Sequence, residues 1–332
     1  MIPEKLRVSI GTASVLGLTE CWLDIKPTTA YLMTYTEGSC IANCAFCPQA
    51  RESPSRKSLL SRVLWPAFPT EKVLNGLRRP IEDVLTRICI QAINYPGFLG
   101  DVLALLRAIG GVTDLPVSLD SPPLDRGEME GLRSAGLDRI SIPLDAATPE
   151  LFDRVKGKLV KGPYRWERHL EALSTAVELL GAGRVMSNLI VGLGETEEET
   201  VSLIQRLMDM GIQTVLFAFT PIPGTMFAGR PQPPLDVYRR VQLARRLITR
   251  GLTRFEEMEF DETGRLTGLG ADPGAIRKVL RSGEAFRTSG CPGCNRPYYN
   301  ERPSGPFYNY PRRLNCEEAR REAAMTGLTD HE

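Results

Sequence analysis

Glu37-Gly-Ser-Cys40-Ile-Ala-Asn-Cys44-Ala-Phe-Cys47-Pro48 follows the strand-like run 30–36 and places three cysteines in the pattern C-x3-C-x-aromatic-C. Three thiolates can hold three irons of a [4Fe–4S] cubane and leave the fourth iron open. A structural zinc site instead takes four closed ligands, commonly from C-x2–4-C pairs. No fourth ligand stands nearby in the sequence. The spacing therefore favours an iron–sulfur cluster bound by Cys40, Cys44 and Cys47.

The composition is that of a globular chain. Its 332 residues are 42% hydrophobic, and no run approaches the roughly 18 apolar residues of a membrane span. The first residues lack the apolar segment of a signal peptide, so we expect a cytoplasmic protein whose eight cysteines are metal ligands and buried thiols rather than disulfides. The net charge of +1, with acids and bases interspersed, predicts no binding to nucleic acid or membrane.

Six apolar runs in the central part of the chain are typical of buried strands, each ended by a polar residue, glycine or proline. They are residues 30–36, 87–93, 116–120, 139–145, 185–191 and 214–220. Helical patterns lie between them, which favours a parallel sheet with crossover helices. An incomplete barrel of six units is the natural closure, and a doubly wound sheet is the alternative.

Two of the expected helices have recognisable starts. Thr148 can cap a helix that has Pro149 in its first turn. Thr196 and Glu199 form a capping box before a second helix, which Gly211 closes. His169 stands in a charged segment, 165–169, and we expect it on a solvated helix face, so histidine chemistry is not predicted.

Polar side chains gather at the carboxyl ends of the expected strands, which is where barrel enzymes place their chemistry. They are Gln91, Asn94, Asp120, Asp145 and Asn188. Any one of them could simply end a strand or cap a helix. Together with the cysteine loop they indicate a shared site at one mouth of the barrel.

Four motifs in order resemble the radical S-adenosylmethionine (SAM) superfamily, in its biotin-synthase-like branch. They are the cysteine loop, Leu144-Asp145 with Thr148-Pro149-Glu150, the segment 190–196 (Ile-Val-Gly-Leu-Gly-Glu-Thr) and the segment 221–225 (Pro-Ile-Pro-Gly-Thr). The resemblance implies a partial (β/α)6 TIM-like barrel. It also implies that the amine and carboxylate of SAM bind the open iron, and that SAM cleavage yields a 5′-deoxyadenosyl radical after reduction by a low-potential electron donor.

The same resemblance assigns roles around SAM. It implies that Phe46 packs near the adenine, that Asp145 and Asn188 contact SAM or substrate, and that Pro221 and Ile222 border the adenine. Many members of the superfamily carry Gly-Gly-Glu after the second strand to bind the methionyl amine. This chain has no such motif in segment 90–95, where Gln91 is the candidate.

A tail rich in proline, glycine and tyrosine carries three more cysteines: Cys291, Cys294 and Cys316. Such a segment does not continue helices or strands easily, and wrapping a metal centre would give it a purpose. A second, auxiliary [4Fe–4S] cluster is the favoured interpretation, and a structural zinc site that holds the tail together is the alternative. We expect the tail to fold back over the open mouth, and Ser289 or Ser282 is the suggested fourth ligand by analogy with a serine ligand in lipoyl synthases.

The segment 289–301 (Ser-Gly-Cys-Pro-Gly-Cys-Asn-Arg-Pro-Tyr-Tyr-Asn-Glu) is similar to the tail of the two-protein lipoyl synthases. In that family two homologous radical SAM proteins thiolate C6 or C8 of an octanoyl chain on a lysine of a lipoyl carrier or H protein, with sulfur from the auxiliary cluster. Biotin synthase uses an arginine ligand inside the barrel, and single-chain lipoyl synthase carries its auxiliary cysteines before the radical SAM loop. Both differ from this tail.

The predicted organisation is an N-terminal extension at 1–28, a radical SAM barrel at 29–255 and an auxiliary-cluster region at 256–332. Cys21 and Cys89 are expected to be packed thiols without a role. Two other functions stay open. One is a radical SAM dehydrogenase whose auxiliary cluster carries electrons, and the other is a non-catalytic scaffold with zinc at both cysteine sets.

Overall fold

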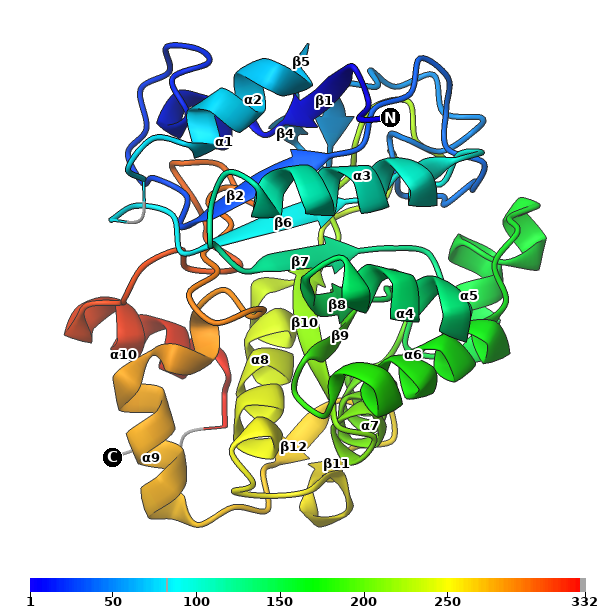
Figure 1. The fold of residues 1–332 in the computed structure, drawn as a ribbon. Coiled ribbons are helices and arrows are strands. Elements are labelled where there is room, and N and C mark those ends of the chain that lie inside the picture. Colours follow the sequence, from blue (N-terminus) through cyan, green and yellow to red (C-terminus); the bar gives the residue numbers. More distant parts are fainter. Residues whose placement is uncertain (82, 329–332) are drawn as a thin grey trace.

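The fold is built on one eight-stranded sheet, in a computed structural model that describes residues 1–81 and 83–328 (Figure 1). Six parallel strands lie side by side in chain order and confirm the six predicted strands. They are β2 (Thr29–Met33), β6 (Arg87–Gln91), β7 (Val117–Asp120), β8 (Leu137–Ser141), β9 (Val185–Val191) and β10 (Ile212–Ala218). This arrangement is the partial barrel of the prediction rather than a doubly wound sheet, which would need a reversal of strand order.

Helices connect successive strands and cover the outside of the curved sheet in Figure 1. They are α2 (Thr70–Leu77), α3 (Phe98–Gly110), α4 (Arg126–Ser134), α5 (Pro149–Val155), α6 (Trp166–Leu180), α7 (Glu197–Asp209) and α8 (Leu235–Thr249). Both predicted caps are present. Thr148 accepts a hydrogen bond from the backbone N–H of Leu151, and Thr196 forms a reciprocal capping box with Glu199. Local sequence therefore sets these two helix starts.

Strand β8 ends at Ser141, four residues before the predicted end at Asp145. Pro143 has no backbone N–H and cannot continue a ladder. Asp145 itself has a φ of 64°, which a strand does not allow, and it keeps one isolated parallel bridge to Leu189. The early end of the strand turns the Asp145 side chain into the mouth of the barrel.

The N-terminal segment contributes to the same sheet. Strand β1 (Lys5–Val8) pairs antiparallel with β2, and β5 (Ala67–Pro69) pairs antiparallel with β1. Helix α1 (Ile10–Val15) follows β1, and β3 (Leu59–Leu60) forms a small hairpin with β4 (Val63–Leu64). The predicted extension 1–28 thus includes a strand of the barrel sheet.

The C-terminal region packs against α8. It contains the hairpin β11 (Glu259–Phe260) and β12 (Leu266–Gly268), followed by α9 (Pro273–Ser282) and α10 (Cys316–Met325). Arg239 of α8 is fully buried and donates to Glu322 of α10 at 2.8 Å, which fixes the last helix to the barrel.

The tail between α9 and α10 fills the open side of the barrel beside β10. The Ser289 hydroxyl accepts a hydrogen bond from the backbone N–H of Leu216 at 2.8 Å. The Asn300 amide donates to the carbonyl of Ala218 at 2.8 Å and accepts from the N–H of the same residue at 3.3 Å. Side chains of the tail therefore replace the strand that is missing next to β10.

The same tail reaches the first strand on the other side of the opening. The Asn295 side chain accepts from the backbone N–H of Thr28 at 3.0 Å and donates to the carbonyl of Lys26 at 2.9 Å. The tail is therefore held between the unpaired edge of β10 and the segment that precedes β2. The tail also reaches the open mouth, as expected, because Tyr299 and Asn300 line the same cavity as the cysteine loop.

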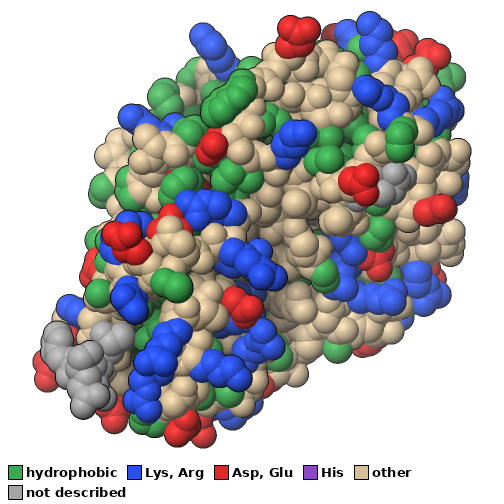
Figure 2. Space-filling model, turned by 90° about the vertical axis from the view of Figure 1, so that its left-hand side faces the viewer, with side chains coloured by type: hydrophobic (Ala, Val, Ile, Leu, Met, Phe, Trp, Pro, Cys, Tyr) green, Lys and Arg blue, Asp and Glu red, His purple; other side chains and the backbone are tan. Residues whose placement is uncertain are grey.

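No helix among the described residues is both long and apolar enough to cross a membrane. On the face shown in Figure 2, Lys and Arg side chains are spread widely, with Asp and Glu side chains among them. This distribution agrees with the near-zero net charge of the whole chain.

Replacing Asn300 by alanine should destabilise the barrel by about 2 to 4 kcal/mol, because two buried backbone groups of Ala218 lose their partner. Denaturant unfolding of the anaerobic protein measures the loss. The matched control is Asn75→Ala on the exposed face of α2, where we expect a change within about 0.5 kcal/mol. Equal stabilities of the two variants would contradict closure by the tail.

Candidate active site

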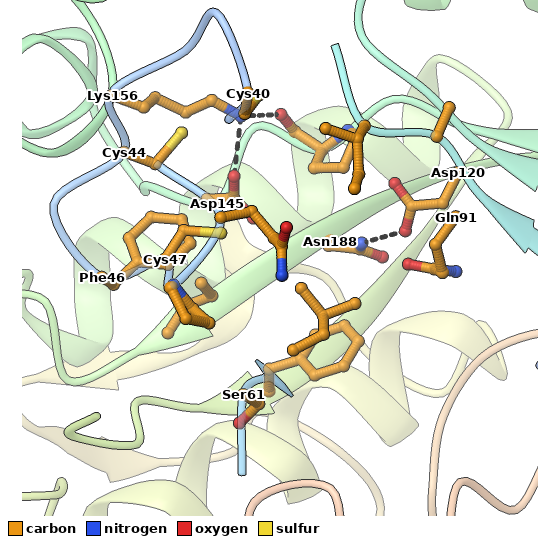
Figure 3. Close-up of a pocket in the computed structure, with 18 of the residues that line it drawn as sticks. Cys40, Cys44, Phe46, Cys47, Ser61, Gln91, Asp120, Asp145, Lys156 and Asn188 are labelled. Carbon is orange, nitrogen blue, oxygen red and sulfur yellow. Dashed lines mark hydrogen bonds and ion pairs between the residues drawn. The ribbon is translucent and has the colours of Figure 1, made fainter. Parts of the chain in front are cut away.

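The three cysteines of the loop after β2 line one cavity of about 210 Å³ at the carboxyl ends of the strands (Figure 3). Backbone hydrogen bonds fix the loop at both ends. The N–H of Cys40 donates to the carbonyl of Gln49 at 3.1 Å, and that of Cys47 donates to the carbonyl of Cys44 at 3.0 Å. The structure thus brings together the predicted ligands Cys40, Cys44 and Cys47.

Lys57 holds the residues that follow the loop. Its ammonium donates to the carbonyls of Pro48, Ala50 and Ser53 at 2.9 to 3.2 Å. A compact cation surrounded by three carbonyl oxygens stabilises a tight turn and adds positive charge near the thiols. The sequence analysis did not single out Lys57.

Burial raises the pKa of all three thiols, that of Cys44 well above its usual range and that of Cys47 to about 12. A buried thiolate is unfavourable unless a cation compensates its charge. Bound iron supplies that compensation, and Fe–S clusters take cysteine as thiolate. The three thiols of one loop, with a wall of the cavity free beside them, fit a cubane with one open iron.

Lys156 lies deepest in this site and was missed by the sequence analysis. Its ammonium is 2.7 Å from a carboxylate oxygen of Asp145 and donates to the carbonyl of Pro143 at 2.6 Å. Burial is the largest single effect and would lower the pKa of Lys156, but Asp145, Cys44 and Asp120 together leave that pKa raised. Lys156 is therefore a buried cation beside Cys44, as Figure 3 shows.

Asp120 and Asn188 form the other polar pair of the mouth. The Asn188 amide donates to Asp120 at 2.8 Å and accepts from the Ser141 hydroxyl at 3.2 Å. Burial raises the pKa of Asp120 to about 7, against the effect of the hydrogen bond from Asn188. A carboxyl group with such a pKa can hold or release a proton near neutrality.

Phe46, Gln91 and Asn94 also line the cavity, as predicted. Pro221 and Ile222 do not line it. They begin a turn whose next two carbonyls, those of Pro223 and Gly224, accept hydrogen bonds from Ser55 and Ser53. Because Ser53 and Ser55 follow the cysteine loop closely in the chain, the turn lies beside that loop. The adenine contacts of Phe46, Pro221 and Ile222 stay predictions.

The expected solvated position of His169 was wrong. His169 is 1% exposed, with its ring edge-on to Phe152 and Tyr164 at centroid distances of 5.0 and 5.2 Å. The helix turns His169 onto the same face as Trp166 and Leu173, so its charged sequence neighbours did not report its environment. Burial, with a smaller effect of the Lys156 charge, lowers the pKa of His169 to about 3.

A second cavity of about 390 Å³ lies deeper in the barrel and holds cysteines of the tail. Cys291 and Cys294 line it, as does Cys89 of β6, which the sequence analysis gave no role. Among the described residues, no three acidic, cysteine or histidine side chains are close enough to hold a single metal ion. A cubane binds each cysteine to a different iron and so accepts wider spacing.

The two cavities adjoin, because both are lined by the same five side chains. These are Gln91, Asp120, Asn188, Phe217 and Tyr299. A molecule bound in the first cavity would therefore be separated from one bound in the second by a single layer of side chains.

Cys316 does not join the other tail cysteines. It is exposed as the first residue of α10 and lines neither of the two barrel cavities in the described structure. The suggested fourth ligands are also engaged elsewhere. Ser289 bonds to β10, and the Ser282 hydroxyl donates to the carbonyl of Val279 at the exposed end of α9. The predicted ligand set of Cys291, Cys294 and Cys316 therefore needs correction at Cys316.

Comparisons with known proteins agree with this geometry. A family model described as the Radical SAM superfamily matches residues 36–207, just over half of the chain. Biotin synthase of Agrobacterium fabrum is 28% identical over 275 residues, covering 79% of this chain and 75% of that protein. Biotin synthase of Neorickettsia sennetsu is 26% identical over 239 residues, covering 68% of this chain and 67% of that protein.

Among solved structures, the FeFe-hydrogenase maturase HydG from Carboxydothermus hydrogenoformans aligns with a TM-score of 0.53 at 18% identity, over 67% of this chain and 52% of that chain. A second HydG structure gives a TM-score of 0.51 at 14% identity, over 66% of this chain and 49% of the other. At these identities the similarity concerns the fold.

Replacing Lys156 by methionine should cost about 3 to 5 kcal/mol of stability, because the Asp145 carboxylate would stay buried without its cation. Adding Asp145→Asn should recover much of this loss, since no buried charge then remains. The control is Lys158→Met, whose pair with Asp153 is exposed and 3.9 Å long, and we expect a change below about 0.5 kcal/mol. Additive losses in the double variant would contradict the pairing.

His169 should make the protein sensitive to acid. Its pKa in the folded state, about 3, is below the unfolded value, so the unfolded chain takes up a proton first as pH falls. Between about pH 7.5 and 5.5 this removes about 1 kcal/mol of unfolding free energy. A His169→Phe variant keeps the ring and should lose about 1 kcal/mol less over that interval. Parallel pH profiles for variant and parent would show that His169 is not buried in its neutral form.

Proposed function

The chain belongs to the radical SAM superfamily, in its biotin-synthase-like branch, and we propose that it is one of two homologous proteins that together make the lipoyl cofactor. Its substrate would be an octanoyl group on a lysine of a lipoyl carrier or H protein. The reaction exchanges a C–H bond at C6 or C8 for a C–S bond. The hydrogen leaves in 5′-deoxyadenosine, and the sulfur comes from an auxiliary cluster.

One observation carries this proposal: a C-x2-C pair of the tail lies inside the barrel, in a cavity that shares a wall with the cysteine-loop site. Sulfur insertion needs the carbon radical and the sulfur donor within reach of one another. A cluster that only relays electrons needs no such common wall, because electrons do not require bond-forming contact. The arrangement therefore supports sulfur transfer over electron transfer as the role of the tail cysteines.

When bound, the reduced cluster and SAM supply a 5′-deoxyadenosyl radical that removes hydrogen from an unactivated carbon. The residues of the chain would hold and shield this chemistry. Cys40, Cys44 and Cys47 would bind three irons, while Lys156 would offset the negative charge of the Cys40 and Cys44 thiolates and Lys57 that of Cys47. Phe217 and Tyr299 exclude water from the shared wall, where a radical must not meet solvent.

The apolar part of the second cavity would take an acyl chain beside the tail cysteines. The lining of this cavity is largely apolar and includes Leu23, Ile25, Val63, Trp65 and Val215. Its volume of about 390 Å³ falls in the range of small-ligand pockets, roughly 300 to 1,000 Å³. An eight-carbon chain on a flexible lysine arm would lose water on entering it, which favours binding by the hydrophobic effect. Some of its polar side chains, Gln91, Asp120 and Asn188, lie at the wall shared with the first cavity.

Biotin formation is the second candidate, because the curated relatives are biotin synthases. Those relatives are below 30% identical, and their name alone does not fix the substrate of this chain. The cysteine-bearing tail, whose sequence is similar to the two-protein lipoyl synthases, favours the octanoyl substrate. The product mass separates the two.

The deciding assay is anaerobic and contains reductant, SAM and an octanoyl-lysine peptide, with and without the homologous partner protein. We expect a peptide heavier by sulfur when both proteins are present, detected by mass spectrometry. A thiolated product with this protein alone would assign it the first insertion, and reaction on a monothiolated peptide alone would assign it the second. A Cys44→Ala variant is the control and should form neither product nor 5′-deoxyadenosine.

Two results would contradict the proposal. A peptide lighter by two hydrogens, without added sulfur, would identify a dehydrogenase with an electron-carrying auxiliary cluster. Biotin formed from its unthiolated precursor, with the octanoyl peptide unchanged, would assign the chain to the activity of its curated relatives.

A further inference from the structure

We propose that Cys89, Cys291 and Cys294 together ligate the auxiliary iron–sulfur cluster, which is held inside the barrel between β6 and the tail. Cys316 is not a ligand. The inference deepens the proposed function and rests on it for the identity of this cluster as the sulfur source. The ligand set itself follows from the positions of the three thiols.

Cys89 points into the barrel from the middle of β6. Its neighbours Ile88 and Ile90 are fully buried on the opposite face, against the outer helices, so strand alternation turns Cys89 inward. Cys89 lines the same cavity as Cys291 and Cys294. It is close enough to both that their charges would raise its pKa, after the larger effect of burial.

The tail presents its two cysteines from one tight turn. The backbone N–H of Cys294 donates to the carbonyl of Cys291 at 3.0 Å, and Gly293 between them has a φ of 79°, which favours glycine. The Cys291 sulfur is 3.2 Å from the Ser118 hydroxyl, and the Cys294 sulfur is 3.1 Å from the Tyr31 hydroxyl. Contacts with β7 and β2 thus fix both sulfurs in the barrel interior.

Two guanidinium groups, those of Arg87 and Arg296, lie close to these thiols. Arg87 donates to Ser118 at 2.9 Å, directly behind Cys291. The backbone N–H of Arg296 donates to Tyr31 at 3.0 Å beside Cys294, and its guanidinium lies 4.0 Å from the centre of the Phe217 ring. The Nε atoms of Arg87 and Arg296 are buried without a hydrogen-bond partner among the described residues.

This excess of positive charge indicates an anionic occupant. Arg87 has Asp138 as an ion-pair partner at 2.6 Å. The half-buried guanidinium of Arg296 donates to the carbonyl of Ser289 at 2.5 Å but has no ion pair in the described part of the chain. Burying an unpaired cation is costly unless a negative group lies beside it. Three thiolates around an iron–sulfur core supply such a charge, which neutral thiols do not.

The test counts iron and sulfide in variants of the full chain reconstituted anaerobically. The background variant carries Cys40→Ala, Cys44→Ala and Cys47→Ala, so that it retains only the auxiliary cluster. We expect about four irons and four sulfides per chain in this background, with the electron paramagnetic resonance signal of a reduced cubane. Adding Cys89→Ala should reduce the iron content at least fivefold, as should Cys291→Ala or Cys294→Ala.

Cys316→Ala and Cys21→Ala are the matched controls, since both thiols are exposed, and each should keep the full iron content. The expected packed position of Cys21 was therefore wrong. Cys89→Ser guards against misfolding, because serine fits the site: it should keep the unfolding midpoint of the metal-free background and still alter or lose the resonance signal. Full iron in Cys89→Ala, or loss of iron in Cys316→Ala, would overturn the ligand set. One zinc per chain in place of iron would overturn the cluster.

These outcomes are separable from those of the proposed function. If the cluster depends on the three cysteines but no thiolated peptide forms, the ligand assignment stands and the proposed reaction fails. If the peptide is thiolated by a chain that has Cys89→Ala and full iron, the reaction stands and the ligand assignment fails.

Discussion

The cost of charging thiols in an apolar interior is the constraint on which this barrel depends. Cys44, Cys47 and Cys89 are half-buried, and the loss of solvation raises the pKa of each. Thiolate ligands there need positive charge from iron and from nearby side chains. Lys156 supplies positive charge at the mouth and Arg296 supplies it deeper inside. Both sites therefore place a basic side chain beside their cysteines, although the two sets of cysteines come from different segments of the chain.

The tail meets a second constraint at the same time. A barrel of six parallel strands leaves the edge of β10 unpaired, and unpaired buried backbone groups are costly. Asn300 and Ser289 pair with that edge, and between them the chain carries Cys291 and Cys294 into the interior. Closure of the fold and delivery of the thiols are therefore achieved by one segment. Opening that segment would disturb both.

Much of this could be predicted from the sequence, because it depends on local order. The six strands, the caps at Thr148 and Thr196, and the grouping of Cys40, Cys44 and Cys47 follow from periodicity and short spacing. The errors concern long-range packing. His169 is buried because of the helix face it occupies, and Cys316 lies away from the other tail cysteines because α10 begins there. Neither the burial of His169 nor the position of Cys316 can be predicted from the residues next to it in the sequence.

Cys89 shows why the missing part was difficult. Within its strand it has the pattern of a small packed residue, and a lone cysteine in an apolar run is most often that. The cysteines that share its cavity, Cys291 and Cys294, lie on a segment some two hundred residues later, and only the closure of the barrel brings the three together. The one local signal was alternation: Arg87, Cys89 and Gln91 share the face opposite to Ile88 and Ile90.

The wall between the cavities connects the two sites electrostatically. Gln91, Asp120 and Asn188 face both sides, and the pKa of Asp120, raised to about 7 by burial, lets this carboxyl be neutral or charged near physiological pH. A neutral carboxyl beside Asn188 adds no repulsion to thiolate-rich sites on either side, whereas a carboxylate would. Because this wall carries the polar groups that both cavities share, occupation of one cavity changes the electrostatic environment of the other. The two cavities are therefore best described as parts of one site that is divided by a shared wall of polar side chains.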